Sequence, residues 1–400
     1  MNQVLLGATI ASLRKQKHMT QAKLAEALDV SYKTISKWET GLGYPEISIL
    51  PRLASVLGVT VDYLLTGERY GIAIAGNLHW DTVQYLDADF RSALLGNVTS
   101  VSQDVGGCVP SIALNLAKID PVIPLVAIGC VGTDENGRRV LTRLQRHYIQ
   151  TSSVTPANAA TGTNTLLIEP SGERFEIRNA NANTLFDPTN IDVSSLNCRI
   201  FHFDRMYLPG YWEPDQEYGC KLARALHDLQ EAGILTSISA AYCRFLPTME
   251  QLSAVLRYCD HLIIDYIWLK KFPDGDSPEG GTSDLKQLLQ KFLDLGVREK
   301  VSVLESYFRS ACLSKNGRFT TVHMPEIRDE DVVSFKGFSD DICAGYLYGT
   351  YQGYSDREVM EFALAAAAIG LTKKKTADGM RPKKDIQQYI ARAREKHSPM

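Results

Sequence analysis

The chain changes character at Gly71, and this change constrains the fold more than any other feature. After Gly71, short apolar runs that suit β-strands alternate with longer amphipathic runs that suit α-helices. Such alternation is typical of a mostly parallel sheet with helices packed on both faces. Before Gly71 the spacing of apolar residues predicts only short helices. We therefore expect an all-α five-helix region followed by a doubly wound α/β domain.

The elements of the α/β region follow from hydrophobic spacing. A hairpin is indicated where two runs with alternating sides are joined by Pro170-Ser171-Gly172-Glu173. The expected strands lie at 72–75, 125–128, 200–203, 235–238, 262–264 and 301–304, and the hairpin strands at 165–169 and 174–178. The expected helices lie at 110–119, 137–147, 217–232, 249–259, 285–295, 341–349 and 357–371.

Capping residues predict where the N-terminal helices begin and end. Thr20 can cap a helix over 21–28, and Ser31 can cap the next helix, over 32–39. Gly41 provides a stop signal after it. A fourth helix is expected after Ser48, with Pro51 tolerated in its first turn, and a final half-helix over 61–65.

The second and third expected helices fit a helix-turn-helix unit. Ala25 is the small residue that close packing requires, and Asp29-Val30 lies at the turn. In the next helix Ile35 and Trp38 are spaced for burial. Polar residues occupy the other faces of that helix, from which side chains can enter a DNA major groove: Tyr32, Lys33, Ser36 and Lys37.

The first 66 residues resemble the Cro/CI-type (XRE) helix-turn-helix family without a gap. The matching positions are Arg14, Thr20-Gln21, Leu24-Ala25, Ser31, Thr34 to Glu39, Gly41, Pro45, Leu53-Ala54 and Leu57-Gly58-Val59. The resemblance implies that Gln21 contacts a phosphate and that Tyr32, Lys33 and Ser36 address bases from the helix over 32–39. Lys33 would meet either guanine or a phosphate. The alternative is a helical bundle that contacts protein. The candidate DNA-binding residues are Gln21, Ser31, Tyr32, Lys33, Ser36 and Lys37.

Charge, cysteine usage and apolar runs exclude several classes of protein. The net charge is −3, but residues 1–69 carry +2, which fits local contact with nucleic acid without proving it. The eight cysteines are scattered without C-x-x-C or zinc spacing, so we expect buried thiols and no metal site. No signal-peptide pattern appears at Met1, and the apolar run 362–371 is too short to cross a membrane. We expect a cytoplasmic protein without membrane contact.

The segment Gly337-Phe338-Ser339-Asp340 carries the sharpest chemical signal. Phosphoryl transfer to an alcohol needs a carboxylate that accepts the hydroxyl proton and N–H donors that stabilise the transferred charge. A helix beginning here provides those N–H groups beside the Asp340 carboxylate. Alternatively, Ser339 or Asp340 is simply the N-cap of the helix that follows.

Residues 71 to about 390 resemble the ribokinase/PfkB carbohydrate-kinase family. The resemblance rests on Gly76 to Asp81, Gly106-Gly107 with Ser111, Gly132 to Gly137, the hairpin over 165–178, and Ser334 to Tyr346. It implies that Asp340 is the catalytic base, that Gly337, Phe338 and Ser339 form an anion hole, and that the hairpin is a lid. The implied substrate- or effector-binding residues are Asp81, Gly106, Gly107, Ser111 and Arg244.

Plain structural explanations remain open for three of these elements. Gly106-Gly107 can serve only to permit a tight turn, because glycine accepts positive φ freely. Asp134 more simply caps a helix than contacts substrate. Asp81 either anchors a hydroxyl or hydrogen-bonds a turn.

The nucleotide side departs from the family pattern at four places. Where the family has D-x-N-x-R, only the arginine remains in residues 240–244. Where the family has N-x-x-E, the glutamate is replaced by Trp268, and a tryptophan cannot hold a magnesium-bound water. Glu305 and Tyr307 replace glycine-rich turn residues, and Ser334-Phe335 replaces D-T. Phe338 also adds bulk to the anion hole. The contrast with the better-kept sugar side predicts ligand binding with weak or lost phosphotransfer.

Together these patterns predict a DNA-binding regulator that responds to a small ligand. We expect a helix-turn-helix domain over 1–66, a linker over 67–71, a PfkB-like domain over 72–390 with lid strands near 82–104 and 163–180, and a tail over 391–400. The expected partners are operator double-stranded DNA, a small polyhydroxylated ligand (a sugar, sugar phosphate or nucleoside) and a second copy of the chain. The alternative is an active carbohydrate or nucleoside kinase that also binds DNA, and only that alternative requires ATP and Mg²⁺.

Overall fold

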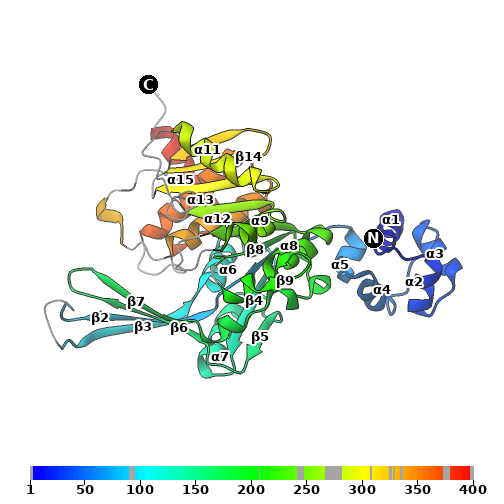
Figure 1. The fold of residues 1–400 in the computed structure, drawn as a ribbon, viewed down its shortest axis with the longest axis horizontal. Coiled ribbons are helices and arrows are strands. Elements are labelled where there is room, and N and C mark those ends of the chain that lie inside the picture. Colours follow the sequence, from blue (N-terminus) through cyan, green and yellow to red (C-terminus); the bar gives the residue numbers. More distant parts are fainter. Residues whose placement is uncertain are drawn as a thin grey trace.

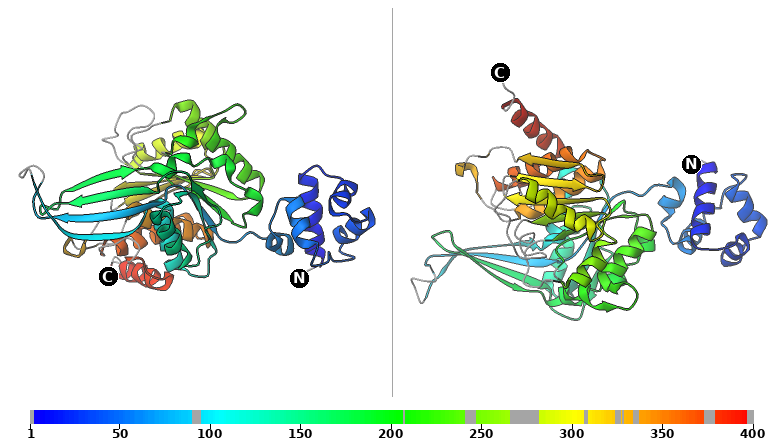
Figure 2. Two further views of the ribbon diagram at one scale, coloured as in Figure 1. Left: turned by 90° about the horizontal axis from the view of Figure 1, so that it is seen from below. Right: turned by 45° about the horizontal axis from the view of Figure 1, so that its top comes forward.

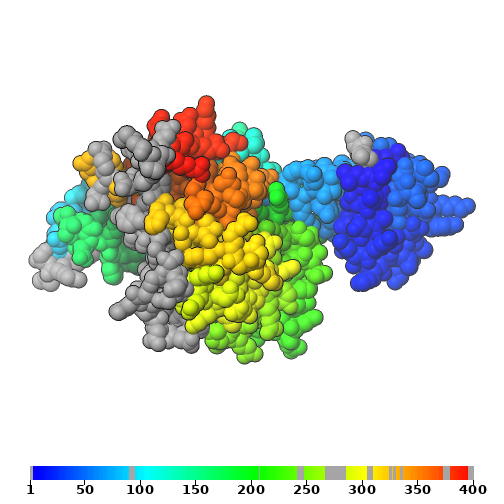
Figure 3. Space-filling view, turned by 90° about the horizontal axis from the view of Figure 1, so that it is seen from above, coloured from blue at the N-terminus to red at the C-terminus, as the bar shows by residue number. Residues whose placement is uncertain are grey.

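The computed structural model describes residues 3–89, 95–206, 208–240, 247–265, 282–306, 309–323, 327, 329–333, 337–372 and 379–396. Figure 1 shows a small helical head, an α/β body, and a lid that projects from the body on the side away from the head. The head forms a separate lobe in the space-filling view of Figure 3.

The head contains the five predicted helices: α1 (Gln3–Gln16), α2 (Gln21–Leu28), α3 (Tyr32–Glu39), α4 (Leu50–Leu57) and α5 (Val61–Thr66). Thr20 and Ser31 accept hydrogen bonds from the backbone N–H groups of Lys23 and Thr34, which confirms both predicted caps. The buried residues of the head core all lie between Leu6 and Leu64. The head therefore closes its own hydrophobic core.

The predicted cap at Ser48 is wrong. Ile49 is the N-cap of α4, and its side chain makes no capping hydrogen bond. The backbone already turns before the helix, with the N–H of Ile49 donating to Glu46 O at 3.0 Å. Pro51 in the first turn has no N–H that needs a partner, so the helix begins without a side-chain cap.

A nine-stranded sheet forms the centre of the body. All six predicted strands are present, and they pair in parallel. Two further strands, β14 and β15, add antiparallel to one edge, and β5 adds parallel to the other. In spatial order the strands are β15 (Phe319–His323), β14 (Arg309–Ser314), β13 (Lys300–Ser306), β12 (His261–Asp265), β11 (Leu235–Ala240), β8 (Ile200–Phe203), β1 (Ile72–Ala75), β4 (Leu125–Gly132) and β5 (Val154–Ala157).

Helices cover both faces of the sheet, as the alternation predicted. On β1, Ile72 and Ile74 belong to one hydrophobic cluster, and Ala73 and Ala75 belong to the other. The first cluster includes α6 (Cys108–Ile119), α12 (Phe338–Tyr351), α13 (Asp356–Leu371), α7 (Glu135–Gln145) and α15 (Lys383–Lys396). The second includes α8 (Lys221–Glu231), α9 (Met249–Leu256) and α11 (Thr282–Asp294).

The lid is a separate four-stranded sheet that extends from the body (Figures 1 and 2). Its order is β3 (Val98–Gly106), β2 (His79–Leu86), β6 (Gly162–Ile168) and β7 (Arg174–Asn179). The antiparallel pairing of β6 with β7 confirms the predicted hairpin. The remaining short elements are the two-stranded ribbon β9 (Pro214–Asp215) with β10 (Gly219–Cys220), and 3-10 turns at Asn181–Leu185, Pro188–Asn190, Val193–Ser195, Pro209–Trp212 and Asp329–Asp331.

Two expectations about the described part of the chain concern thiols and membranes. The seven cysteines that the structure describes are free and buried, as predicted. None of its described helices combines the length and the hydropathy that crossing a bilayer requires.

Candidate functional site

A cavity of about 390 Å³ lies where the lid meets the body, beside the start of α12. Its volume is within the usual range for small-molecule sites. The cavity brings together six predicted site residues from three segments of the chain: Asp81, Gly107, Ser111, Gly337, Ser339 and Asp340. Its other lining residues are His79, Cys108, Asn164, Leu166, Arg174, Glu176, Arg178 and Arg205.

Neither Ser339 nor Asp340 is the N-cap of α12, so the alternative that one of them merely caps this helix is wrong. Gly337 is the N-cap, with φ +80°, and no side chain caps the helix. Ser339 and Asp340 therefore lie inside the first turn, where backbone N–H groups have no partner within the helix. The Phe338 ring does not fill the cavity as predicted, because it packs into a hydrophobic cluster with Ile342 and Tyr346.

Arg205 forms an ion pair with Asp340, the candidate base. Its Nη2 lies 2.7 Å from Asp340 Oδ1, and its Nε lies 3.3 Å from Asp204 Oδ2. The guanidinium thus bridges two buried carboxylates. Arg205 has φ +52°, a conformation that costs a residue other than glycine about 1–2 kcal/mol.

The pKa values of these two carboxylates are shifted in opposite directions. Burial raises the pKa of Asp340 to about 6, against the attraction of the Arg205 charge. Burial also opposes ionisation of Asp204, but hydrogen bonds from His202 and Ser239 and the charge of Arg205 lower the pKa of Asp204 to about 2. Of the pair, Asp340 is the carboxyl that takes up a proton more readily.

A buried network behind the cavity fixes Asp204. His202 Nδ1 lies 3.0 Å from Ser237 Oγ, and His202 Nε2 lies 3.4 Å from Asp204 Oδ1 and 3.2 Å from Cys343 Sγ. The ligand atoms of His202, Asp204 and Cys343 all lie within 4.8 Å of one another, a separation that a metal site would allow. Burial raises the pKa of the Cys343 thiol well above its ordinary value. The distances among these side chains describe a buried hydrogen-bond network.

Sequence reasoning missed this group of polar residues. A usable signal was present, because Asp204 and Arg205 directly follow the buried strand β8. Ligands of open α/β sheets bind at the carboxyl ends of the strands.

The two glycines at the end of β3 have different reasons to be glycine. Gly107 has φ +86°, which confirms that the turn requires a glycine. At Gly106 the constraint is space, because an added Cβ would lie 2.0 Å from Asp81 Oδ1. Close approach of Asp81 to this backbone therefore depends on Gly106. Asp134, by contrast, is the N-cap of α7 and accepts from the N–H of Gly137 at 2.9 Å, as predicted.

Lid residues add polar groups to the cavity. Arg178 pairs with Glu176 at 2.7 Å, and Asn164 Nδ2 donates to Glu176 Oε1 at 2.7 Å. His79 Nε2 and Asn164 Oδ1 are buried, and neither has a hydrogen-bond partner among the described residues. Burial lowers the pKa of His79 to about 4, so its ring is neutral at pH 7.

Much of the predicted nucleotide side lies outside the described residues. This applies to Arg244, Trp268, Tyr307 and Ser334-Phe335, and to the side chain of Glu305.

The recognition face of the head consists of exposed side chains on α3. Ile35 and Trp38 are buried as predicted, while Tyr32, Lys33 and Lys37 are exposed and Ser36 is half-buried. Two other candidates make contacts within the head. Gln21 Nε2 donates to Glu39 Oε2 at 2.8 Å, and Ser31 caps α3.

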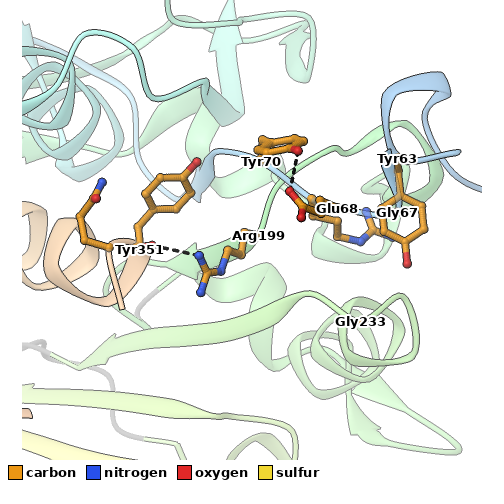
Figure 4. Close-up of a pocket in the computed structure, with 9 residues that line it drawn as sticks. Tyr63, Gly67, Glu68, Tyr70, Arg199, Gly233 and Tyr351 are labelled. Atoms are coloured by element: carbon orange, nitrogen blue, oxygen red, sulfur yellow. Dashed lines mark hydrogen bonds between the residues drawn. The ribbon is translucent and has the colours of Figure 1, made fainter. Parts of the chain in front are cut away.

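A second cleft, of about 640 Å³, lies at the joint between head and body, which we define as residues 67–71. Arg69 donates from Nη1 to Leu196 O at 2.7 Å, and its guanidinium lies over the Tyr63 ring at 4.7 Å. Tyr351, the last residue of α12, accepts from the Gly71 N–H at its hydroxyl, 3.3 Å away. Its carbonyl accepts from Arg199 Nη1 at 3.1 Å (Figure 4). The helix that begins at the cavity therefore ends at the joint.

Comparisons with known proteins agree with this division. Residues 77–384 match the model of the pfkB family carbohydrate kinases, and residues 10–64 match a helix-turn-helix model. The chain belongs to the pfkB family and carries a helix-turn-helix segment in front of the kinase-like domain.

Solved structures similar to the body include a ribokinase from Arabidopsis thaliana complexed with ribose and ATP, at 18% identity and TM-score 0.67, covering 80% of this chain and 99% of that one. A nucleoside kinase from Burkholderia thailandensis in complex with inosine is 14% identical, with TM-score 0.61, and covers 81% of this chain and 98% of that one. These likenesses establish the ribokinase-like fold.

The head is similar to part of the HTH-type transcriptional activator BcrR of Enterococcus faecalis. The two are 48% identical over 60 residues, which are 15% of this chain and 29% of the activator. The chain thus spans less than a third of that relative.

Proposed function

We propose that this protein is a ligand-responsive transcriptional regulator. A head over residues 1–66 binds operator DNA, and a body over 72–390 binds a small polyhydroxylated effector such as a sugar, sugar phosphate or nucleoside. Residues 67–71 link the two. Operator binding would place its action in the cytoplasm.

The exposed face of α3 supports DNA binding by the head. Lys33 and Lys37 are exposed cations on the same short helix as Tyr32, a residue that is 57% exposed. We expect Lys33→Ala to weaken operator binding in a fluorescence anisotropy titration and to reduce the dependence on salt. Lys286→Ala, an exposed lysine of α11, is the matched control. Equal affinities for the Lys33 variant and wild type at every salt concentration would contradict DNA binding through this helix.

The ion pair between Asp340 and Arg205 is the observation that favours a ligand sensor over an active kinase. A general base must be within reach of the hydroxyl whose proton it accepts. Here an arginine already occupies one oxygen of Asp340 at 2.7 Å. A guanidinium at this place also disfavours a second cation such as Mg²⁺ beside the same carboxylates. This arrangement supports weak or lost phosphotransfer.

The signal would travel along α12. The helix has 14 residues and thus spans about 20 Å, from its first turn at the cavity to Tyr351 at the joint. Because Tyr351 bonds the Gly71 N–H, a shift of α12 on ligand binding would move the joint and the attached head. In a dimer this would change the spacing of two heads on two half-sites. Analytical ultracentrifugation tests the dimer.

An active kinase that also binds DNA is the second candidate, and one observation favours it. The pKa of Asp340 is raised to about 6 by burial, which brings this carboxyl closer to what a general base needs at neutral pH. The experiment is coupled ATP turnover over a panel of sugars and nucleosides, comparing wild type with Asp340→Asn. Turnover that disappears in the variant would establish the kinase and refute the sensor without catalysis.

A further inference from the structure

The cleft at the joint contains two arginines without a carboxylate partner. Arg69 belongs to the joint, and Arg199 directly precedes β8. Each donates from Nη1 to a backbone carbonyl, and among the described residues neither forms an ion pair. Glu68 is the one acidic group among the described residues that line the cleft, and it already accepts from the Tyr70 hydroxyl at 2.6 Å (Figure 4). Two guanidiniums against one carboxylate leave this lining with an excess of positive charge.

Arg69 has a buried donor that the described residues do not satisfy. The residue is half-buried, and its Nε is buried without a hydrogen-bond partner among them. Burial also lowers the pKa of Arg69 below its ordinary value, because these surroundings disfavour its charge. A buried polar group without a partner costs stability. An anion beside Arg69 would supply both the missing acceptor and the opposite charge.

Tyrosine rings orient both guanidiniums. The Arg69 guanidinium lies over the Tyr63 ring at 4.7 Å, and that of Arg199 lies over the Tyr351 ring at 5.8 Å. A ring against the face of a guanidinium leaves the N–H groups at its edge available. The edge is the part of the group that binds a carboxylate or a phosphate with two parallel hydrogen bonds. Both arginines are thus oriented before an anion arrives.

Arg224 on α8 shows the same stacking with its charge balanced by the protein. Its guanidinium lies over the Tyr218 ring at 4.7 Å. It also forms ion pairs with Asp215 and Glu217. Arg69 stacks at the same distance from its tyrosine, but no carboxylate of the described residues pairs with it. The difference between the two arginines is therefore an anion, which at the joint the described residues do not provide.

We propose that the joint cleft binds a small organic acid, either a carboxylate or a phosphate ester, whose acidic group is held by Arg69 and Arg199. The cleft has a volume of about 640 Å³, which is in the range of small-molecule sites. It shares none of its described lining residues with the lid cavity, so this site is additional to that of the proposed effector. Because Arg69 belongs to the joint and Arg199 to the body, an acid held by both would tie the joint to the body.

Thermal shift measurements on the full chain test the site with acids and their neutral counterparts. The probes are succinate with succinamide, and glycerol 3-phosphate with glycerol, at an ionic strength kept equal with sodium chloride. We expect at least one acid to raise the melting temperature of wild type, and the neutral counterparts to have little effect. A response to one acid alone identifies the acidic group that the site prefers. If neither acid stabilises wild type more than its neutral counterpart does, the proposal is overturned.

Variants of the two arginines assign the effect to the joint. Arg199→Met removes an exposed guanidinium and should weaken acid binding about tenfold or more, because hydrogen bonds to charged groups are strong. Arg69→Met should have the same effect. Arg224→Met is the matched control, because it removes a stacked arginine whose charge already has a partner, and it should respond to the acid as wild type does. Equal responses of wild type and Arg199→Met overturn the proposal.

Hydrogen exchange of the full chain locates the bound acid. We expect the acid to slow exchange at the backbone N–H groups of residues 67–71 and 196–199. Slower exchange confined to the start of α12 would place the acid in the lid cavity and overturn the proposal. Asp340→Asn separates this test from the proposed function, because it changes the lid cavity and should leave acid binding at the joint unchanged. Acid binding that changes in this variant counts against the joint site.

Discussion

The ion pair between Arg14 and Glu39 offers the most quantitative test of the head. Arg14 Nε lies 2.5 Å from Glu39 Oε1, and Nη2 lies 3.0 Å from Oε2. The two side chains are 11% and 6% exposed. Arg14 Nη1 also donates to Met19 O at 2.6 Å. The arginine thus joins α1, α3 and the segment before α2.

Arg14→Met keeps most of the buried chain length and removes the charge. Of the hydrogen bonds that Glu39 makes in this network, the one from the Gln21 amide then remains. Breaking a buried pair costs about 3–5 kcal/mol, and we expect the lower end because the pair lies at the edge of the head core. A loss of about 3 kcal/mol would speed hydrogen exchange in the head roughly 100-fold.

Hydrogen exchange of the full chain, followed by mass spectrometry, measures this loss directly. Faster exchange should be confined to peptides from α1 to α5, because the head core contains no body residue. The matched control is Arg138→Met, which breaks a pair with Glu135 on α7 whose side chains are 72% and 55% exposed. Exposed pairs contribute little, so the control should exchange as wild type does.

The pH dependence of hydrogen exchange in wild type and in Arg14→Met tests this explanation. In wild type, burial opposes the charge, but hydrogen bonds from Arg14 and Gln21 lower the pKa of Glu39 below its ordinary value. That pair therefore stabilises the head above the unfolded pKa of about 4.3, and its contribution is lost as pH falls through the folded pKa. In the variant, burial dominates and raises the pKa, so the penalty is present at neutral pH and disappears on acidification. The exchange ratio of variant to wild type should shrink between about pH 7 and about pH 5. A ratio that is constant with pH, or below about twofold throughout, would refute the reasoning.

Three further predictions concern the body. Burial raises the pKa of Asp341 well above its ordinary value, so Asp341→Asn should leave the melting temperature nearly unchanged. Asn115→Ala removes the amide that donates to the neutral Asp341 at 2.6 Å, and it should lower the free energy of unfolding by about 1–3 kcal/mol in calorimetry. Equal losses for the two variants would contradict this. Gly162→Ala places a Cβ 2.2 Å from Asn183 Nδ2 at the base of the lid, and we expect about 1–3 kcal/mol of destabilisation in denaturant titrations. Tyr351→Phe removes the hydroxyl that accepts a hydrogen bond from the Gly71 N–H. Ligand affinity measured by calorimetry should be unchanged, but the effect of the ligand on operator affinity should fall. An unchanged effect on operator affinity would contradict transmission through α12.

Local patterns explain what could be predicted of the fold. The six parallel strands were found because a strand buried on both faces is a continuous apolar run. The helices of the head were found from caps such as Thr20 and Ser31, whose signals act within four residues. The antiparallel strands β14 and β15 were missed because polar residues interrupt their apolar runs and because their pairing depends on β13 rather than on their own sequence.

The candidate site was predicted only in part, for the same physical reason. The family pattern led to Asp81 and Asp340, which the fold brings into one cavity. The partner of Asp340 lies 135 residues away in the chain. The position of Arg205 after β8 places it at the carboxyl edge of the sheet but does not identify Asp340 as its partner. Contacts over such separations depend on the order of strands in the sheet, which the sequence pattern did not determine.

The self-contained core of the head has a consequence for synthesis of the protein. Chains fold from the N-terminus as they leave the ribosome, and domains fold as units. Because every buried residue of the head core lies before the joint, the head can fold while the body is still being made. An incomplete or proteolysed chain would then present the α3 surface to DNA without the cavity that responds to ligand. Such fragments would compete for operators regardless of ligand concentration, so the integrity of the chain becomes part of its regulation.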